Sequence, residues 1–142
     1  MKGKKIYLKA RSLHDKLYSQ SKQLNFNEKT NLYNQYKSLI KKAAYLGNSD
    51  AQYDYAQLFE SISYFDLNNP NYYPKKCIYW YTKACNQGHP AACNNLASFY
   101  ENGEGVDKNL KKAFFLYKKS SDLGYSLGVE NFNIMREQEW PK

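Results

Sequence analysis

Side chains that could carry out chemistry are few in this 142-residue chain. Three cysteines and two histidines, His14 and His89, are the main candidates, and nothing places them together at the spacing of zinc ligands. Gly103-x-Gly105 lies between two expected helices and not between a strand and a helix, so it is no phosphate-binding loop. We therefore expect no metal, no cofactor and no enzyme activity.

The spacing of apolar residues predicts helices almost throughout and no strand. The expected helices span residues 4–23, 28–46, 49 to about 63, 75–87, 91–100, 110–123 and 126–138. In the first of them, Leu8, Leu13, Leu17 and Tyr18 are expected to share one buried face. Ser49 or Asp50 is the expected cap of the third helix. Residues 66–74 contain two prolines and several asparagines and form an inserted loop.

One segment recurs about every 36 residues. The stretches 39–47, 80–88 and 116–124 align with one another and each ends in a glycine. Their closing residues, Gly47, Gly88 and Gly124, are 41 and 36 residues apart, so one copy carries an insertion. A fixed period of this size is typical of a solenoid, in which no single unit can bury its apolar face alone.

The residues of these copies resemble the Sel-1-like repeat, a relative of the tetratricopeptide repeat. The resemblance rests on Lys83-Ala84-Cys85, Gly88, Ala92, Leu96-Ala97, Tyr100, Gly103, Gly105-Val106, Lys112-Ala113 and Leu116-Tyr117. It implies an all-α, right-handed α/α solenoid of antiparallel helix pairs with about seven helices. We expect a single domain over 1–142, with a divergent helical cap at 1–35, repeats at 36–136 and a tail at 137–142.

Two cysteines fall on either side of the turn at Gly88. Cys85 ends one expected helix, and Cys93 begins the next. This pair resembles the cysteine-rich branch of the same repeat family, in which it bridges adjacent helices. The resemblance therefore implies a Cys85–Cys93 disulfide, and two reduced buried thiols are the alternative. Cys77 is left without a partner in either case.

Localisation depends on those cysteines. No signal peptide is recognisable at the start of the sequence, which favours the cytoplasm. A disulfide instead favours the periplasm or secretion, in which case the start of the chain would have been trimmed. No run of 18 apolar residues exists, so no membrane span is expected.

The net charge of +8 raises the question of a nucleic-acid partner. Several lysines occupy equivalent positions in successive repeats, as Lys75 and Lys111 do. Recurrence of this kind is typical of a solvated outer face. We therefore expect neither a nucleic acid nor a small-molecule substrate as partner.

A protein or peptide partner is expected instead, in a concave groove lined by the first helix of each pair. The positions there that packing does not require are polar or acidic. They are Tyr53, Gln57, Glu60, Asn94, Ser98, Glu101 and Glu130. The acidic side chains would fix a basic segment and Tyr53 would supply contact area. The alternative is that all seven are ordinary polar surface residues.

Three classes of function remain open. A non-enzymatic interaction module or adaptor is the preferred hypothesis, and a bacterial immunity-type protein that neutralises a toxin is a specific variant of it. The resemblance to the cysteine-rich branch also implies a weak penicillin-binding or β-lactamase-like enzyme. Such an enzyme would need a Ser-x-x-Lys motif, which occurs at Ser19 and at Ser38. With 11 serines and 19 lysines in 142 residues, chance alone gives about 1.5 matches.

Overall fold

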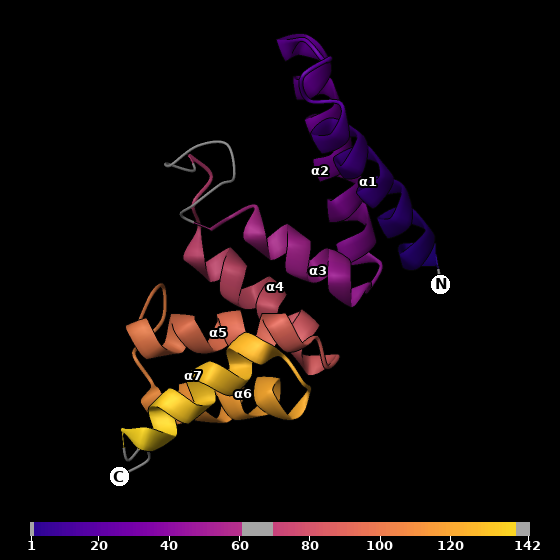
Figure 1. Cartoon of the computed structure of the whole chain (residues 1–142). Coiled ribbons are helices and arrows are strands. Elements are labelled where there is room, and N and C mark those ends of the chain that lie inside the picture. Colours follow the sequence, from indigo (N-terminus) through magenta and orange to yellow (C-terminus); the bar gives the residue numbers. More distant parts are fainter. Residues whose placement is uncertain (1, 61–69, 139–142) are drawn as a thin grey trace. The chain divides into compact units, whose positions relative to one another are not determined.

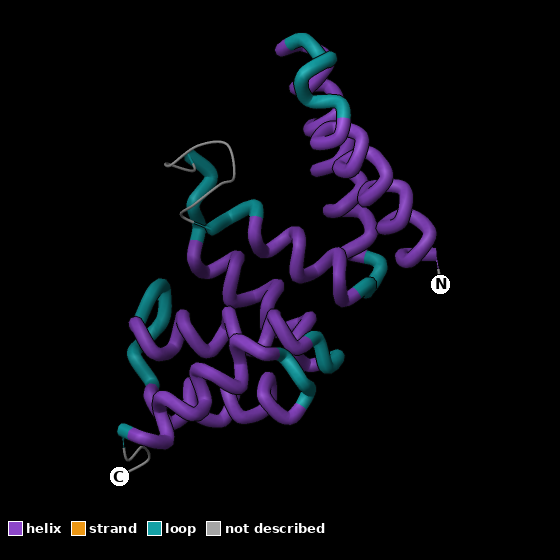
Figure 2. The backbone as a smooth tube through the Cα atoms, viewed as in Figure 1, coloured by secondary structure: helices purple, strands orange, loops and turns teal. Residues whose placement is uncertain are grey.

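The structure is a computed structural model that describes residues 2–60 and 70–138. Within these residues it consists of seven α-helices joined by turns and loops, without a strand (Figure 2). The helices are α1 (Lys2–Ser19), α2 (Phe26–Tyr45), α3 (Ser49–Gln57), α4 (Pro74–Asn86), α5 (Pro90–Asn102), α6 (Leu110–Asp122) and α7 (Ser126–Glu137). The all-α fold built from helix pairs is confirmed. The expected end of the third helix near residue 63, the first part of the inserted loop and residues 139–142 lie outside the described residues.

The chain divides into two compact units, Met1–Tyr55 and Ala56–Lys142. In the first unit, α1 and α2 pack against each other. The buried row on α1 is Gly3, Ala10 and Leu17, spaced seven residues apart. A Cβ on Gly3 would stand 3.3 Å from the carbonyl oxygen of Ala43. Because the start of α1 meets the end of α2, the two helices are antiparallel.

The expected apolar face of the first helix was partly wrong. Leu17 is buried, but Leu8 is 57% exposed and Tyr18 is 42% exposed. Nine residues separate Leu8 from Leu17, and at 100° per residue they lie on opposite sides of the helix. Gly3 and Ala10 let α1 approach α2 closely on the side of Leu17, and Leu8 is left on the side that faces solvent.

Asparagines cap two helices of the first unit. The Asn25 side chain accepts from the backbone N–H of Glu28 at 2.9 Å, and the Glu28 carboxylate accepts from the Asn25 N–H at 2.8 Å. This capping box starts α2 at Phe26. The expected cap of α3 was wrong by one residue, because Asn48 Oδ1 accepts from the Ala51 N–H at 2.8 Å. Ser49 is the first helical residue.

In the second unit, α4 packs on α5, α5 on α6 and α6 on α7 (Figure 1). Four alanines that share full burial let the helices approach closely; they are Ala84, Ala92, Ala97 and Ala113. The aromatic rings of Tyr81 and Tyr117 fill the wider spaces and are also buried. Burial between helices fixes the direction in which the hydroxyl groups of these rings point.

The recurring glycines close successive turns in the same way. Gly47, Gly88 and Gly124 have φ values of 88°, 84° and 84°. In each turn the N–H after the glycine donates to a carbonyl five residues earlier, as from His89 to Ala84 at 3.1 Å. This is the Schellman arrangement, in which a left-handed residue ends a helix. A side chain at these positions would be strained, which explains why glycine recurs.

The last helix packs tightly against α6. Gly128, in the first turn of α7, is buried. A Cβ there would stand 2.2 Å from Ser120 Oγ. Ser120 is itself fully buried and donates to the Pro90 carbonyl at 2.8 Å. Ser120 occupies the repeat slot of Ala84, so the missing side chain of Gly128 makes room for the larger serine.

Candidate partner-binding pocket

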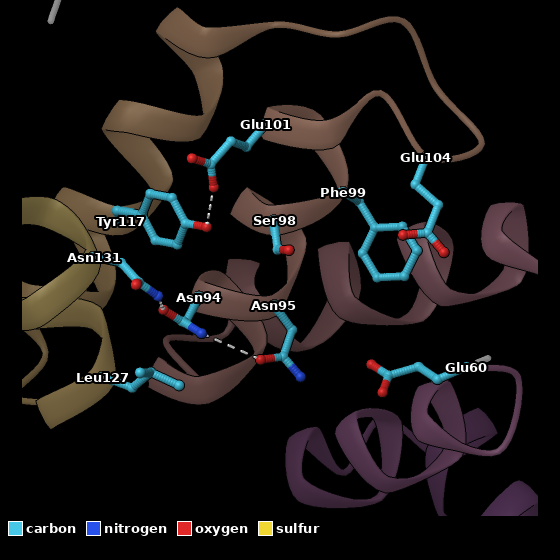
Figure 3. Close-up of a pocket in the computed structure, with 10 residues that line it drawn as sticks. All are labelled: Glu60, Asn94, Asn95, Ser98, Phe99, Glu101, Glu104, Tyr117, Leu127 and Asn131. Atoms are coloured by element: carbon cyan, nitrogen blue, oxygen red, sulfur yellow. Dashed lines mark hydrogen bonds between the residues drawn. The ribbon is translucent and has the colours of Figure 1, made fainter. Parts of the chain in front are cut away.

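A pocket of about 490 Å³ lies in the second unit. Helix α5 supplies half of its lining, and α6, α7, the turn after α5 and the segment after α3 supply the rest (Figure 3). The lining residues are Glu60, Asn94, Asn95, Ser98, Phe99, Glu101, Glu104, Tyr117, Leu127 and Asn131. Three of them carry carboxylates and none is basic.

A chain of amide side chains crosses the pocket floor (Figure 3). Asn131 Nδ2 on α7 donates to Asn94 Oδ1 on α5 at 2.9 Å. Asn94 Nδ2 is 3.4 Å from Asn95 Oδ1, and Asn95 Nδ2 donates to the Tyr81 hydroxyl at 3.2 Å. Asn94 is 4% exposed, and a polar group so buried needs partners of this kind. The amide chain therefore holds α4, α5 and α7 in register at the pocket.

Two carboxylates of the pocket are each held by a buried tyrosine. The Tyr81 hydroxyl donates to Glu60. The Tyr117 hydroxyl donates to Glu101 at 2.7 Å, as Figure 3 shows. The two tyrosines are one repeat apart, and so are the two glutamates. The same Tyr–Glu hydrogen bond therefore occurs in two successive repeats, each time between the first and the second segment of the repeat.

Burial shifts the protonation of these groups. The pKa of Glu60 is raised above its usual value, mainly by loss of solvent; the Tyr81 hydrogen bond lowers it, and the nearby Glu104 raises it further. The pKa of Tyr117 is raised by burial and then by its bond to Glu101. The Tyr117 hydroxyl therefore stays protonated and donates to Glu101.

Glu104 is placed by the turn between α5 and α6. Gly103 caps α5 in the left-handed conformation, with a φ of 66°. Gly105 has a φ of 67°, and a Cβ on it would stand 2.6 Å from the Pro74 side chain. The Gly-x-Gly turn therefore packs on the start of α4. The Tyr72 hydroxyl, just before that helix, donates to the Glu104 carboxylate.

Four of the seven binding residues expected from the sequence line this pocket. They are Glu60, Asn94, Ser98 and Glu101. Gln57 is half-buried in the last turn of α3, and Glu130 is exposed on α7; neither lines the pocket. Tyr53 is half-buried and belongs to the first unit. The grouping of all seven on one surface remains a prediction.

Six lining residues were not singled out from the sequence. They are Asn95, Phe99, Glu104, Tyr117, Leu127 and Asn131. One signal was available, because Asn95 and Asn131 are one repeat apart and so repeat an amide in one slot. The ring of Tyr117 belongs to the core, with 3% of the residue exposed, and the residue also lines the pocket.

The disulfide implied by the family resemblance is present. Cys85 at the end of α4 and Cys93 at the start of α5 are bonded, and their Cα atoms are 4.7 Å apart. Closing so short a loop contributes about 2.5 kcal/mol in the chain-entropy model. Asn94 directly follows Cys93, so the bond also fixes the helix end that carries the amide chain.

Cys77 is a free, buried thiol that contacts the Ala56 carbonyl oxygen at 3.5 Å. Burial raises its pKa to about 12, with smaller effects from Glu60 and Glu104. A thiol in this state is a poor nucleophile. Over residues 2–60 and 70–138, no group of three or more His, Cys, Asp or Glu side chains is arranged to hold a metal ion.

Antiparallel helix pairs that repeat with glycine-closed turns define an α/α repeat protein. The model of the Sel1 repeat matches residues 49–89 and 90–125, which together make up more than half of the chain. The chain belongs to the Sel1 repeat family. Proteins of this family are generally interaction modules without enzyme activity. None of the described helices combines the length and the apolar character needed to cross a membrane.

Solved structures share the fold. A Sel1 repeat protein from Oxalobacter formigenes is 23% identical, with a TM-score of 0.62, over 73% of this chain and 41% of its own. The protective antigen c5321 of uropathogenic Escherichia coli, described as an SLR fold, is 31% identical, with a TM-score of 0.64, over 75% of this chain and 22% of its own. This chain therefore spans less than half the length of either protein.

A third structure is of similar length. Helicobacter pylori cysteine-rich protein B is 22% identical, with a TM-score of 0.64, and the match covers 91% of each chain. At this identity the likeness shows the fold alone. No curated protein matches the sequence.

Proposed function

We propose that this chain is a non-enzymatic interaction module and that the pocket of the second unit binds a basic segment of a protein or peptide partner. The carboxylates of Glu60, Glu101 and Glu104 line one pocket, and no basic residue is among its described lining, in a chain whose net charge is +8. This observation carries the proposal, because clustered carboxylates attract a lysine or arginine side chain of a partner.

Two further features support a peptide or loop as the occupant. The amides of Asn95 and Asn131 offer donors and acceptors that suit the polar groups of a main chain. Phe99 and Leu127 give the lining apolar contact area, and Leu127 is 43% exposed. Carboxylates, amides and apolar surface together match a short segment with a basic side chain better than they match a small apolar ligand.

The experiment begins with capture of partners on the full-length chain, followed by titration calorimetry with the purified candidate. Glu101→Gln with Glu104→Gln removes two negative charges from the pocket while keeping side-chain size. Glu130→Gln with Glu137→Gln removes two charges from α7 outside the pocket, where both residues are exposed. The first variant is expected to bind at least tenfold more weakly, and the control to bind as the wild type does.

The two double variants also separate the pocket from the wider surface expected from the sequence. Equal losses in both would show that diffuse charge drives binding and would overturn the assignment of the pocket. Wild-type affinity in the pocket variant would do the same. Circular dichroism of each variant checks that the helices remain folded.

A further inference from the structure

A row of lysines runs along α1 on the side that faces solvent. Lys2, Lys5, Lys9 and Lys16 occupy positions i, i+3, i+7 and i+14, which share one helical face, and all four are exposed. The row spans about 21 Å, at a rise of about 1.5 Å per residue. We propose that this lysine row binds the phosphate backbone of a double-stranded nucleic acid.

The lysine row is electrostatically unfavourable for the isolated helix. The first turn of α1 contains lysines and no acidic residue, although the helix dipole favours negative charge there. Lys5 and Lys9 form a like-charge pair at i, i+4, which also destabilises a helix. Across residues 2–60 and 70–138, no ion pair involves any of the four ammonium groups. A bound polyanion would offset both penalties.

The charge of the chain is concentrated in the unit that carries this row. Met1–Tyr55 contains 11 basic and 4 acidic residues, a net charge of +7, whereas Ala56–Lys142 contains 10 and 9, a net charge of +1. The equivalent lysines of the repeats lie mostly in the second unit, where the two signs nearly balance, although Lys42 lies in the first. They leave the excess of the first unit unexplained, and a polyanionic partner accounts for it.

The chemistry of the row favours a duplex over a lipid surface or a single strand. The apolar side of α1, with Ala10 and Leu17, is buried and is not available to enter a bilayer. The row contains no aromatic side chain on which unpaired bases could stack. Lysines bind phosphates as point charges, and phosphate contacts carry no sequence information, so the expected binding is independent of sequence.

The test measures binding of a 20-base-pair fluorescent duplex to the full chain by anisotropy at several salt concentrations. Four phosphate contacts predict a slope of about −3.6 in log K against log salt, or about a 150-fold loss between 50 and 200 mM. The variant with Lys2, Lys5, Lys9 and Lys16 all changed to Gln is expected to lose at least tenfold in affinity at 50 mM and most of the slope.

A matched control removes the same charge from the second unit. Its four lysines are exposed residues outside the row, each changed to Gln: Lys75, Lys108, Lys111 and Lys119. The control is expected to keep both the affinity and the slope. Equal losses in the two variants, or no binding of the duplex at 50 mM, would overturn the proposal. So would binding to phosphatidylserine vesicles without binding to the duplex, because the partner would then be a membrane surface.

Discussion

Replacing Asp54 by asparagine should stabilise the first unit at neutral pH. Asp54 lies on α3, and its side chain is only 12% exposed. Its Oδ2 atom is buried without a hydrogen-bond partner, and the nearest cation, Arg11 Nη1, is 3.8 Å away. The Tyr7 hydroxyl hydrogen bonds to the carboxylate. One hydrogen bond and one distant guanidinium do not replace the water that the charged group has lost.

The pKa of Asp54 gives the size of this cost. Burial raises the pKa from 3.8 to about 6. Asp50 raises it slightly, and Arg11 and Tyr7 oppose the shift. A difference of about two units corresponds to about 3 kcal/mol, at 1.36 kcal/mol per unit. Because the folded state holds this proton more tightly than the unfolded state does, stability falls as the pH rises from about 4 to about 6 and then stays level.

Asparagine stays uncharged throughout, so the benefit of Asp54→Asn depends on pH. The free energy of unfolding of the variant should exceed that of the wild type by about 1 to 3 kcal/mol at pH 7.5 and by little at pH 4. Urea denaturation followed by circular dichroism measures both values, and carbon-13 NMR of the carboxyl group gives its pKa directly. The control is Asp15→Asn, because Asp15 is 70% exposed and also lies beside Arg11.

The reasoning would be refuted by a carboxyl pKa near 4. It would equally be refuted by a variant that is less stable than the wild type at pH 7.5, since Arg11 would then compensate the buried charge fully. A gain of the same size in Asp15→Asn would show that the effect comes from general charge balance and not from burial.

Three other changes test the packing of the second unit. Gly128→Ala should destabilise the protein by about 1 to 3 kcal/mol in thermal melts, because the new Cβ meets Ser120, although the same change in an open helix usually stabilises. Adding Ser120→Ala to this variant should restore part of the lost stability. Replacing Cys85 and Cys93 by alanine should lower the free energy of unfolding by about 2.5 kcal/mol, and reductant should affect the wild type alone. Tyr117→Phe should cost about 1 to 2 kcal/mol in urea denaturation, since a pocket carboxylate loses its donor.

The repeat pattern predicted the parts of the fold that depend on local backbone chemistry. Gly47, Gly88 and Gly124 recur in one slot, and all three adopt the same left-handed conformation. The presence and order of the helices could also be predicted, because the apolar residues of each helix recur at the helical period. The packing between helices could not be predicted in this way. It depends on pairs such as Gly128 and Ser120, which lie on different helices and come into contact only in the folded structure.

The binding surface shows a second limit of the sequence. Glu130 occupies the repeat slot of Asn94, so it was expected in the groove, yet its neighbour Asn131 lines the pocket. One residue along a helix turns the side chain by 100°, and periodicity does not fix the rotation of a helix so closely. The amide chain from Asn131 to Asn94 fixes that rotation, and it requires two helices to be in place.

The Tyr–Glu bonds join the core to the pocket. Each buried ring positions a hydroxyl that holds a carboxylate at the pocket wall, so the charge of Glu60 and Glu101 is fixed before any partner arrives. A cationic side chain that binds there would not need to order these carboxylates, which lowers the entropic cost of association. The same coupling means that a lysine at Glu60 would disturb the Tyr81 bond as well as the binding surface. Charge-neutral glutamine at Glu101 and Glu104 therefore separates affinity from folding better than charge reversal at the buried position.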